Sequence, residues 1–186
     1  MPRIKMFDQE EAFGKALDLF WEKGYEATSL SDLTAHLNIG KGSFYDTFGS
    51  KKQLFDNCLS AYRMNAFEML DSFIAEKPDP HEGVAYFIDK HTEMMFTDTI
   101  SKGCFIANST VELSDDSETQ DFLREHYQIM KSKLVDYLNR GSFKNDVDTL
   151  AESILVHMTG ISVLSKVNTD KSVFDKSNAL FMQLVT

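Results

Sequence analysis

Apolar side chains recur every three or four residues along most of the chain, and this spacing places them on one face of an α-helix. The first such segment covers residues 9–23, where Phe13, Leu17 and Phe20 share a face. Gly24 follows directly, and glycine is a common residue just beyond the end of a helix. The pattern therefore predicts an amphipathic first helix of about four turns.

Two short helices are predicted next, with a tight turn between them. Ser29 caps the first one, and Leu33 and Leu37 lie on its apolar face. The turn covers residues 38–40 and contains a glycine, and the second short helix covers 41–48. A helix followed by two short helices with such a turn between them is the order of elements in a helix-turn-helix unit.

A long helix is predicted over residues 51–76, with an apolar stripe along most of its length. It is too long for the small N-terminal unit alone, so we expect it to connect that unit to the rest of the chain. The sequence Lys-Pro-Asp-Pro at 77–80 is the clearest break, because proline disrupts a helix interior. Five further helical segments are predicted after the break, at about 82–98, 102–112, 118–140, 147–167 and 172–185.

The composition supports an all-α fold, because only three of the 186 residues are proline and nine are glycine. We predict an N-terminal three-helix helix-turn-helix domain over 1–50, a connecting helix over 51–76 and a larger helical domain over 77–186. No apolar run is long enough for a membrane span, and two cysteines are too few for a disulfide framework. These features predict a cytoplasmic protein without a membrane partner.

The net charge of −10 argues at first against a nucleic-acid partner. Residues 1–60 carry seven basic and nine acidic side chains, a balance of −2, whereas 61–186 carry twelve and twenty, a balance of −8. Within 38–63 the sign reverses, because four basic residues outnumber two acidic ones. A small basic region on an acidic protein still allows DNA binding, with a weak and salt-sensitive non-specific affinity.

The first 60 residues, roughly, carry several motifs in register. The motif residues are Ala16-Leu17-Asp18-Leu19-Phe20, Gly24-Tyr25-Glu26-Ala27-Thr28-Ser29, Leu33, Ile39-Gly40-Lys41-Gly42-Ser43-Phe44-Tyr45, Phe48, Ser50-Lys51 and Leu54-Phe55. This region resembles the DNA-binding domain of TetR/AcrR-type transcriptional regulators. The helical remainder is compatible with the ligand-binding and dimerisation domain of that family. The resemblance implies a regulator that binds operator DNA.

The resemblance and the local chemistry together predict the contacts to DNA. The predicted DNA-binding residues are Thr28, Lys41, Gly42, Ser43, Tyr45, Thr47 and Lys51. Lys41 and Ser43 lie at the start of the recognition helix, where base edges in the major groove are read. By resemblance, Tyr45 contacts a phosphate, and Lys51 at the start of the next helix binds another. Thr28 looks like the residue that anchors the second helix to the backbone.

Two further features of the recognition helix come from residue type. Glycine at positions 40 and 42 lets the backbone approach phosphate or base edges closely. Phe44 is expected to pack inward with Phe48. Position 47 is Thr where the family very often has His, and Asp46 places a carboxylate on a helix that faces phosphates. That carboxylate either accepts from a cytosine amino group or points away from the DNA.

The last two helical segments predict the subunit interface. Segment 147–167 is apolar around much of its circumference, which is typical of a helix that is buried on two sides. Segment 172–185 is short and also apolar. Together they predict a homodimer built as a symmetric helical bundle. The alternative is that both segments belong to the core of a single chain.

An effector site is predicted in the C-terminal domain, because members of this family usually release DNA when a small molecule binds there. The candidate wall residues of this site are Phe67, Phe87, Met94, Met95, Phe105, Tyr127, Met130 and Met158. Ordinary core packing is the alternative for most of them. None of these side chains identifies the class of ligand.

Cys104 gives a sharper prediction. Segments 102–108 and 160–167, the latter with Lys166 near its end, resemble segments of repressors of N-ethylmaleimide-reductase type, which sense electrophiles and oxidants through a cysteine near a lysine. A nearby cation, or the N-terminus of its own helix, would lower the pKa of the thiol. The alternative is a small buried apolar residue, which is the interpretation we prefer for Cys58.

The predicted function is a homodimeric DNA-binding regulator, a repressor relieved by a small ligand, an electrophile or thiol modification, acting on a palindromic operator. The rival hypothesis is a helical ligand-binding or scaffold protein that has lost DNA binding. The sequence shows no nucleophile motif, no phosphate-binding glycine loop and no metal-ligand spacing among its five histidines. No enzyme activity, cofactor or metal is therefore predicted.

Overall fold

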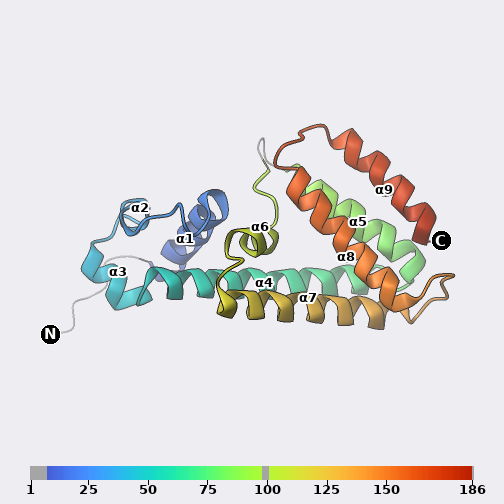
Figure 1. Cartoon of the computed structure of the whole chain (residues 1–186), viewed down its shortest axis with the longest axis horizontal. Helices are drawn as coiled ribbons and strands as arrows, with labels where there is room; N and C mark the ends of the chain where they lie inside the picture. Colours follow the sequence, from blue (N-terminus) through green and yellow to red (C-terminus); the bar gives the residue numbers. More distant parts are fainter. Residues whose placement is uncertain (1–7, 98–100, 186) are drawn as a thin grey trace.

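The computed structural model describes residues 8–97 and 101–185. Within these ranges the chain forms nine α-helices and no β-strand, which confirms the predicted all-α fold. The helices are α1 (Gln9–Lys23), α2 (Leu30–His36), α3 (Lys41–Phe48), α4 (Lys51–Glu76), α5 (Pro80–Met95), α6 (Phe105–Glu112), α7 (Ser117–Leu138), α8 (Val147–Leu164) and α9 (Lys171–Val185). We call α1 to α3 the head and α5 to α9 the body. In Figure 1, α1 to α3 lie at one end of α4 and α5, α8 and α9 at the other, while α6 and α7 pack along α4 between them.

Local capping sets the helix ends in the head. Asp8 accepts hydrogen bonds from two backbone N–H groups of the first turn of α1, at 2.9 and 3.2 Å. Ser29 and Asp32 form a reciprocal capping box at the start of α2. Gly49, with a φ of +75°, ends α3. The predicted bounds of the first and third helices are confirmed. Capping residues and glycines act on the residues next to them, so they mark these ends in the sequence itself.

Some predicted helix ends in the body differ from the structure. α5 begins at Pro80 rather than at residue 82, because proline is favoured in the first turn of a helix. α6 begins at Phe105 rather than at residue 102, because Gly103 has a φ of +68°, which a helix cannot contain. The predicted end of the α5 segment at residue 98 lies outside the described residues.

The core of the head is closed by residues from the body. Phe105 of α6 packs edge-on against Phe55, with 5.5 Å between the ring centroids, and Phe55 packs in the same way against Phe20 at 5.2 Å. Leu113 and Leu123, which follow along the chain, belong to the same buried cluster. Burial of each such side chain contributes roughly 1.5–3 kcal/mol, so the head depends on α6 for its stability.

Hydrogen bonds add to this apolar contact between head and body. The Glu112 carboxylate accepts from the backbone N–H groups of Tyr25 and Glu26, at 3.0 and 2.8 Å, in the loop between α1 and α2. Trp21 donates its indole N–H to the Gly103 carbonyl at 3.1 Å. The two ends of the α6 segment therefore both hold α1 and its following loop.

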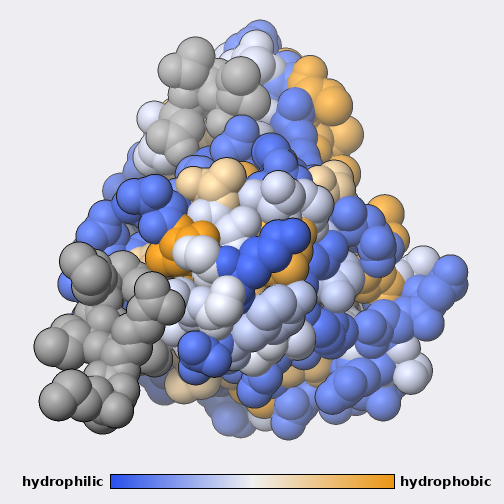
Figure 2. Space-filling model, turned by 90° about the vertical axis from the view of Figure 1, so that its left-hand side faces the viewer, coloured by the Kyte–Doolittle hydropathy of each residue, from blue (hydrophilic) through white to orange (hydrophobic). Residues whose placement is uncertain are grey.

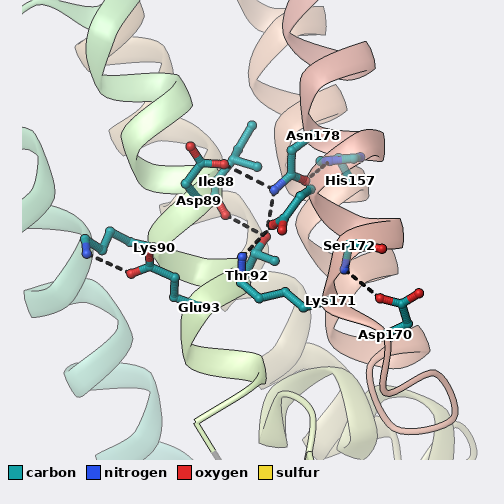
Figure 3. Close-up of polar contacts among 11 residues, drawn as sticks. Ile88, Asp89, Lys90, Thr92, Glu93, His157, Asp170, Lys171, Ser172 and Asn178 are labelled. Atoms are coloured by element: carbon teal, nitrogen blue, oxygen red, sulfur yellow. Dashed lines mark hydrogen bonds and ion pairs between the residues drawn. The ribbon is translucent and has the colours of Figure 1, made fainter.

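A polar network with Thr92 and Asn178 buried at its centre lies where α5, α8 and α9 meet (Figure 3). Asn178 donates to Thr92 Oγ1 at 2.9 Å and to the Asp89 carboxylate at 3.3 Å. A carboxylate only accepts hydrogen bonds, so the amide nitrogen of Asn178 must face Asp89. The amide oxygen then accepts from His157 Nε2 at 3.0 Å. Thr92 in turn donates to the Ile88 carbonyl at 2.9 Å. These paired groups fix the position of α9 on the body.

His91 of α5 is held in its neutral form inside the body. Its Nε2 lies 3.2 Å from the Met158 carbonyl and 2.9 Å from Ser162 Oγ. A carbonyl only accepts, so Nε2 carries the proton. Burial lowers the pKa of His91 to about 4, from an ordinary value of 6.5. A second proton on this ring therefore disfavours the folded state.

Stability should accordingly fall as the pH is lowered. The folded-state pKa of His91 is depressed, so the unfolded chain binds more protons between pH 6.5 and about 4, and the contribution to stability that is complete above 6.5 is lost through that window. In chemical denaturation, the His91→Gln variant should lose about 2 kcal/mol less than the wild type between pH 7 and pH 5. The matched variant of the exposed His36, His36→Gln, should lose as much as the wild type. Equal losses for all three proteins would contradict the buried neutral imidazole.

Candidate nucleic-acid interface and effector cavity

The turn between α2 and α3 sets the geometry of the helix-turn-helix unit. Asn38 has a φ of +54°, a left-handed conformation in which asparagine is enriched. The Ile39 N–H donates to the Thr34 carbonyl at 3.0 Å, which closes the turn. Phe44 and Phe48 are buried, with 5.5 Å between their ring centroids, so the predicted inward packing of α3 is confirmed.

The opposite side of α3 is accessible at the end of the molecule. Lys41, Gly42 and Tyr45 are exposed, Tyr45 to 52%, while Ser43 and Thr47 are partly exposed. Figure 2 views the molecule from this end and shows a predominantly hydrophilic surface. Lys41, Gly42, Ser43 and Tyr45 can therefore be reached from outside, whereas the hydroxyl oxygen of Thr47 is buried.

The two glycines at the start of α3 are not required by the fold. Gly40 has a φ of −73°, which any residue adopts, and a Cβ at Gly40 or Gly42 would meet no atom within 4 Å. The missing side chains leave open space in front of the first turn of α3. Backbone N–H groups at a helix start can approach a phosphate closely through such a space.

Thr28 and Lys51, the other two predicted contacts, lie against the loop between α1 and α2. Thr28 is fully buried, and its hydroxyl donates to the Gly24 carbonyl at 2.6 Å. Its side chain therefore positions the start of α2 and does not reach the surface. The Lys51 ammonium donates to the Tyr25 carbonyl at 2.7 Å and lies 4.1 Å from the centroid of the Tyr25 ring. This contact holds the lysine at the start of α4, beside the head.

A cavity of about 310 Å³ lies in the body and is closed on one side by the head; we call it the effector cavity. Its walls come from α1, α4, α5, α7 and α8 and from the α6 segment. The predicted effector residues that line it are Phe87, Met94, Met95, Cys104, Tyr127, Met130 and Met158. The structure thus brings together side chains from four separate predicted segments.

Three of the predicted effector residues lie elsewhere. Phe67 is stacked on His126, at 5.3 Å between ring centroids, and does not line the cavity. Phe105 packs into the core of the head. Lys166 lines a neighbouring cavity between α1, α6 and α8, where its ammonium lies 3.3 Å from Asn108 Oδ1. Lys166 and Cys104 therefore line different cavities.

The two cysteines have different surroundings. Cys104 is the cap residue of α6 and neighbours Tyr62 in the effector cavity. Burial, and then the Cys104 thiol beside it, hold the pKa of Tyr62 well above its usual range. Cys58 is fully buried in α4, and burial raises the pKa of its thiol to about 12. The predicted core position of Cys58 is confirmed.

Two parts of the cavity wall were not predicted from the sequence. On α4, Tyr62, Ala66 and Met69 line the cavity, and their spacing of four and three residues was a usable signal for one helix face. On α1, Leu17 and Trp21 also line it. Nothing in the sequence pattern indicates that a helix of the head reaches this cavity, because that contact depends on how head and body pack.

Large apolar side chains are exposed on the outer faces of α8 and α9. They are Val156, Val163, Leu164, Val173, Leu180 and Leu184, with exposed fractions from 43% to 72%. Among the helices of the described residues, α8 alone has the length and composition that would allow a membrane crossing. Its other face is buried against α5 and α7. The apolar surface of α8 is therefore only partly covered within one chain.

The sequence is similar to known regulators along most of its length. Residues 14–58 match the family described as bacterial regulatory proteins, tetR family. The uncharacterized HTH-type transcriptional regulator YezE of Bacillus subtilis is 26% identical over 182 residues, which cover 91% of this chain and 92% of YezE. The HTH-type transcriptional repressor ComR of Escherichia coli is 28% identical over 183 residues, covering 88% of this chain and 82% of ComR.

Solved structures share the fold. A cysteine variant of the TetR-family transcriptional regulator CifR, in a complex with 26-base-pair operator DNA, has a TM-score of 0.87 at 24% identity and covers 97% of this chain and 98% of its own. Reduced NemR from E. coli has a TM-score of 0.82 at 16% identity, with coverages of 95% and 96%. The matched N-terminal segment, the similar regulators and the shared fold agree with the geometry of α2 and α3, and the chain therefore belongs to the TetR family of bacterial regulatory proteins and is a transcriptional regulator.

Proposed function

We propose that this protein is a homodimeric repressor that acts in the cytoplasm and binds a palindromic operator through α3 of each subunit. The observation that carries the proposal is the accessible first turn of α3, where Lys41 and Ser43 flank Gly42 in front of open space. Side chains at such a helix start read base edges in the major groove. Two copies related by a two-fold axis place two such helices on two half-sites, which makes the operator palindromic.

The proposed dimer rests on the exposed faces of α8 and α9. In a single chain, side chains such as Val156 and Leu180 are 72% and 64% exposed to water. Pairing the same faces of two chains across a two-fold axis would bury them in a four-helix arrangement. Each square ångström of apolar surface removed from water contributes roughly 25 cal/mol, so this face favours association.

The proposed signal acts through the effector cavity. An effector changes DNA affinity only if it binds one arrangement of head and body better than the other. The lining of the cavity supports such a difference, because Leu17 and Trp21 of the head and residues of the body line it together. Cys104 lines it as well, so alkylation or oxidation of the thiol is a second way to change its contents. ComR is a repressor by name, which supports the same sign of regulation here.

Selection from random duplex DNA tests the proposal directly. The protein should enrich a palindromic consensus, and its affinity for that operator should fall as the salt concentration rises. Lys41→Ala should weaken operator binding roughly tenfold and relax the preference at one position of each half-site, because it removes a side chain that reads a base. Titration of a fluorescently labelled operator measures both effects.

A matched control for this test is Lys144→Ala, which removes the same charge from an exposed position between α7 and α8, far from the head. It should leave operator affinity unchanged. If selection enriches no sequence at any salt concentration, DNA binding is excluded. If Lys41→Ala and Lys144→Ala weaken binding equally, Lys41 does not read the operator.

The proposed interface predicts the effect of a charge on the outer face of α9. Leu180→Asp should weaken dimerisation by at least about tenfold, because the carboxylate and its copy in the other subunit would both have to be desolvated. Val111→Asp is the matched control, since Val111 is 75% exposed on α6, outside α8 and α9. Sedimentation equilibrium of the three proteins measures the change. A Leu180→Asp variant that associates like the wild type would rule out this interface.

The proposed response to modification of Cys104 predicts that thiol reagents react selectively with this cysteine. N-ethylmaleimide should alkylate Cys104, which lines the cavity, and spare Cys58, which is fully buried with a pKa of about 12. The alkylated wild type should bind operator at least about tenfold more weakly, whereas treated Cys104→Ser should bind as before treatment. Peptide mass mapping identifies the modified residue. Full alkylation of Cys104 without any change in operator affinity would refute a sensing role for this thiol.

A further inference from the structure

The described wall of the effector cavity contains no side chain of the types that are charged at neutral pH. Its polar groups are hydroxyl, amide, thiol and imidazole groups, such as those of Tyr62, Asn65 and Thr159. The rest of this wall is apolar and includes five methionines. Methionine adapts its shape to a bound molecule but offers no charge to pair with one.

The two histidines in this wall are neutral at neutral pH. Burial lowers the pKa of His91 to about 4, and burial together with the charge of Arg63 lowers that of His126 to about 4. Arg63 itself does not line the cavity. Its guanidinium binds the Glu125 carboxylate at 2.8 Å and lies 4.0 Å from the centroid of the Phe122 ring. Arg63 is therefore already paired, and its position favours neutral His126.

These walls select against ions. An ionised molecule that enters the cavity loses its hydration and finds no opposite charge among the described lining residues, which is strongly unfavourable. An uncharged molecule with one or two polar groups can exchange its hydrogen bonds with water for bonds to the hydroxyl and amide groups of the wall. The cavity volume of about 310 Å³ lies at the lower end of the range for ligand pockets, so the molecule is small.

One side of the cavity belongs to the head. Trp21 lines the cavity, donates to the Gly103 carbonyl at 3.1 Å and packs edge-on against Tyr62, with 5.1 Å between the centroids. It is the single tryptophan of the chain. A molecule in the cavity therefore touches the head itself, and Trp21 fluorescence reports its presence.

We propose that the effector is a small, uncharged and predominantly apolar molecule that binds in this cavity against Trp21, and that ionised molecules of similar shape are excluded. The inference rests on the proposed function in treating the cavity occupant as the effector. The aromatic and methionine side chains supply the apolar contact. Tyr62 and Thr159 supply hydroxyl groups for one carbonyl, ether or hydroxyl group of the ligand.

Two fluorescent probes with the same anilinonaphthalene skeleton test the charge selection. N-phenyl-1-naphthylamine is uncharged, and 8-anilinonaphthalene-1-sulfonate is its sulfonated counterpart. With the wild-type protein, the uncharged probe should bind once per chain and quench Trp21 by energy transfer. The sulfonated probe should bind at least about tenfold more weakly at the same site. Equal or tighter binding of the sulfonated probe, with the same quenching of Trp21, would overturn the proposal.

Variants of the wall establish where the probe binds. Ala66→Phe fills the cavity from α4 and Thr159→Phe fills it from α8, and each should reduce binding of the uncharged probe at least about tenfold. Met64→Phe is the matched control, because Met64 is exposed on α4 two residues from Ala66. Circular dichroism checks that the variants are folded. Undiminished binding to both folded cavity variants would place the probe elsewhere and overturn the proposal.

The inference and the proposed function fail separately. Operator selection and titration without any probe test the repressor, and the wild-type probe comparison tests the cavity. Failed operator enrichment with the expected probe selectivity would remove the repressor and leave the cavity specificity intact. Normal operator binding with a preference for the sulfonated probe at Trp21 would leave the repressor and remove the uncharged effector.

Discussion

The packing of α6 of the body against the head is the contact on which the other features of this protein depend. Phe105 completes the core of the head, while its chain neighbours Cys104 and Ile106 line the effector cavity. Glu112, at the other end of α6, binds two backbone N–H groups before α2. A helix that is shared by two sites cannot move at one without a change at the other, because a close-packed core does not deform continuously.

Charge is distributed in keeping with this arrangement. The chain is acidic overall, which weakens its general attraction to DNA, so in the proposed function recognition depends on the few groups that α3 presents. The described wall of the cavity, in contrast, is built from neutral groups, and His91 and His126 are kept neutral by burial. In the proposed function, α3 selects DNA by hydrogen bonds to bases and phosphates, whereas the cavity selects its ligand by excluding charged molecules.

The outer faces of α8 and α9 carry apolar side chains that a single chain leaves exposed. Inside the body, the Asn178 network holds α9 against α5 and α8 with its polar groups paired. Outside, residues such as Val156 and Leu184 remain in water in the single chain. Because the internal contacts already fix α8 and α9, these helices would lose little conformational entropy if two chains associated through their apolar outer faces.

The sequence by itself determined the helices of the head, including the predicted recognition helix α3, because capping residues and glycines such as Ser29 and Gly49 act on their immediate neighbours. It also indicated several walls of the cavity, including Met130 and Met158, through helical spacing. Only the tertiary structure decided that Trp21 closes the cavity and that Lys166 faces a different one. Those outcomes depend on the angle at which helices from distant segments pack, and local periodicity contains no information about that angle.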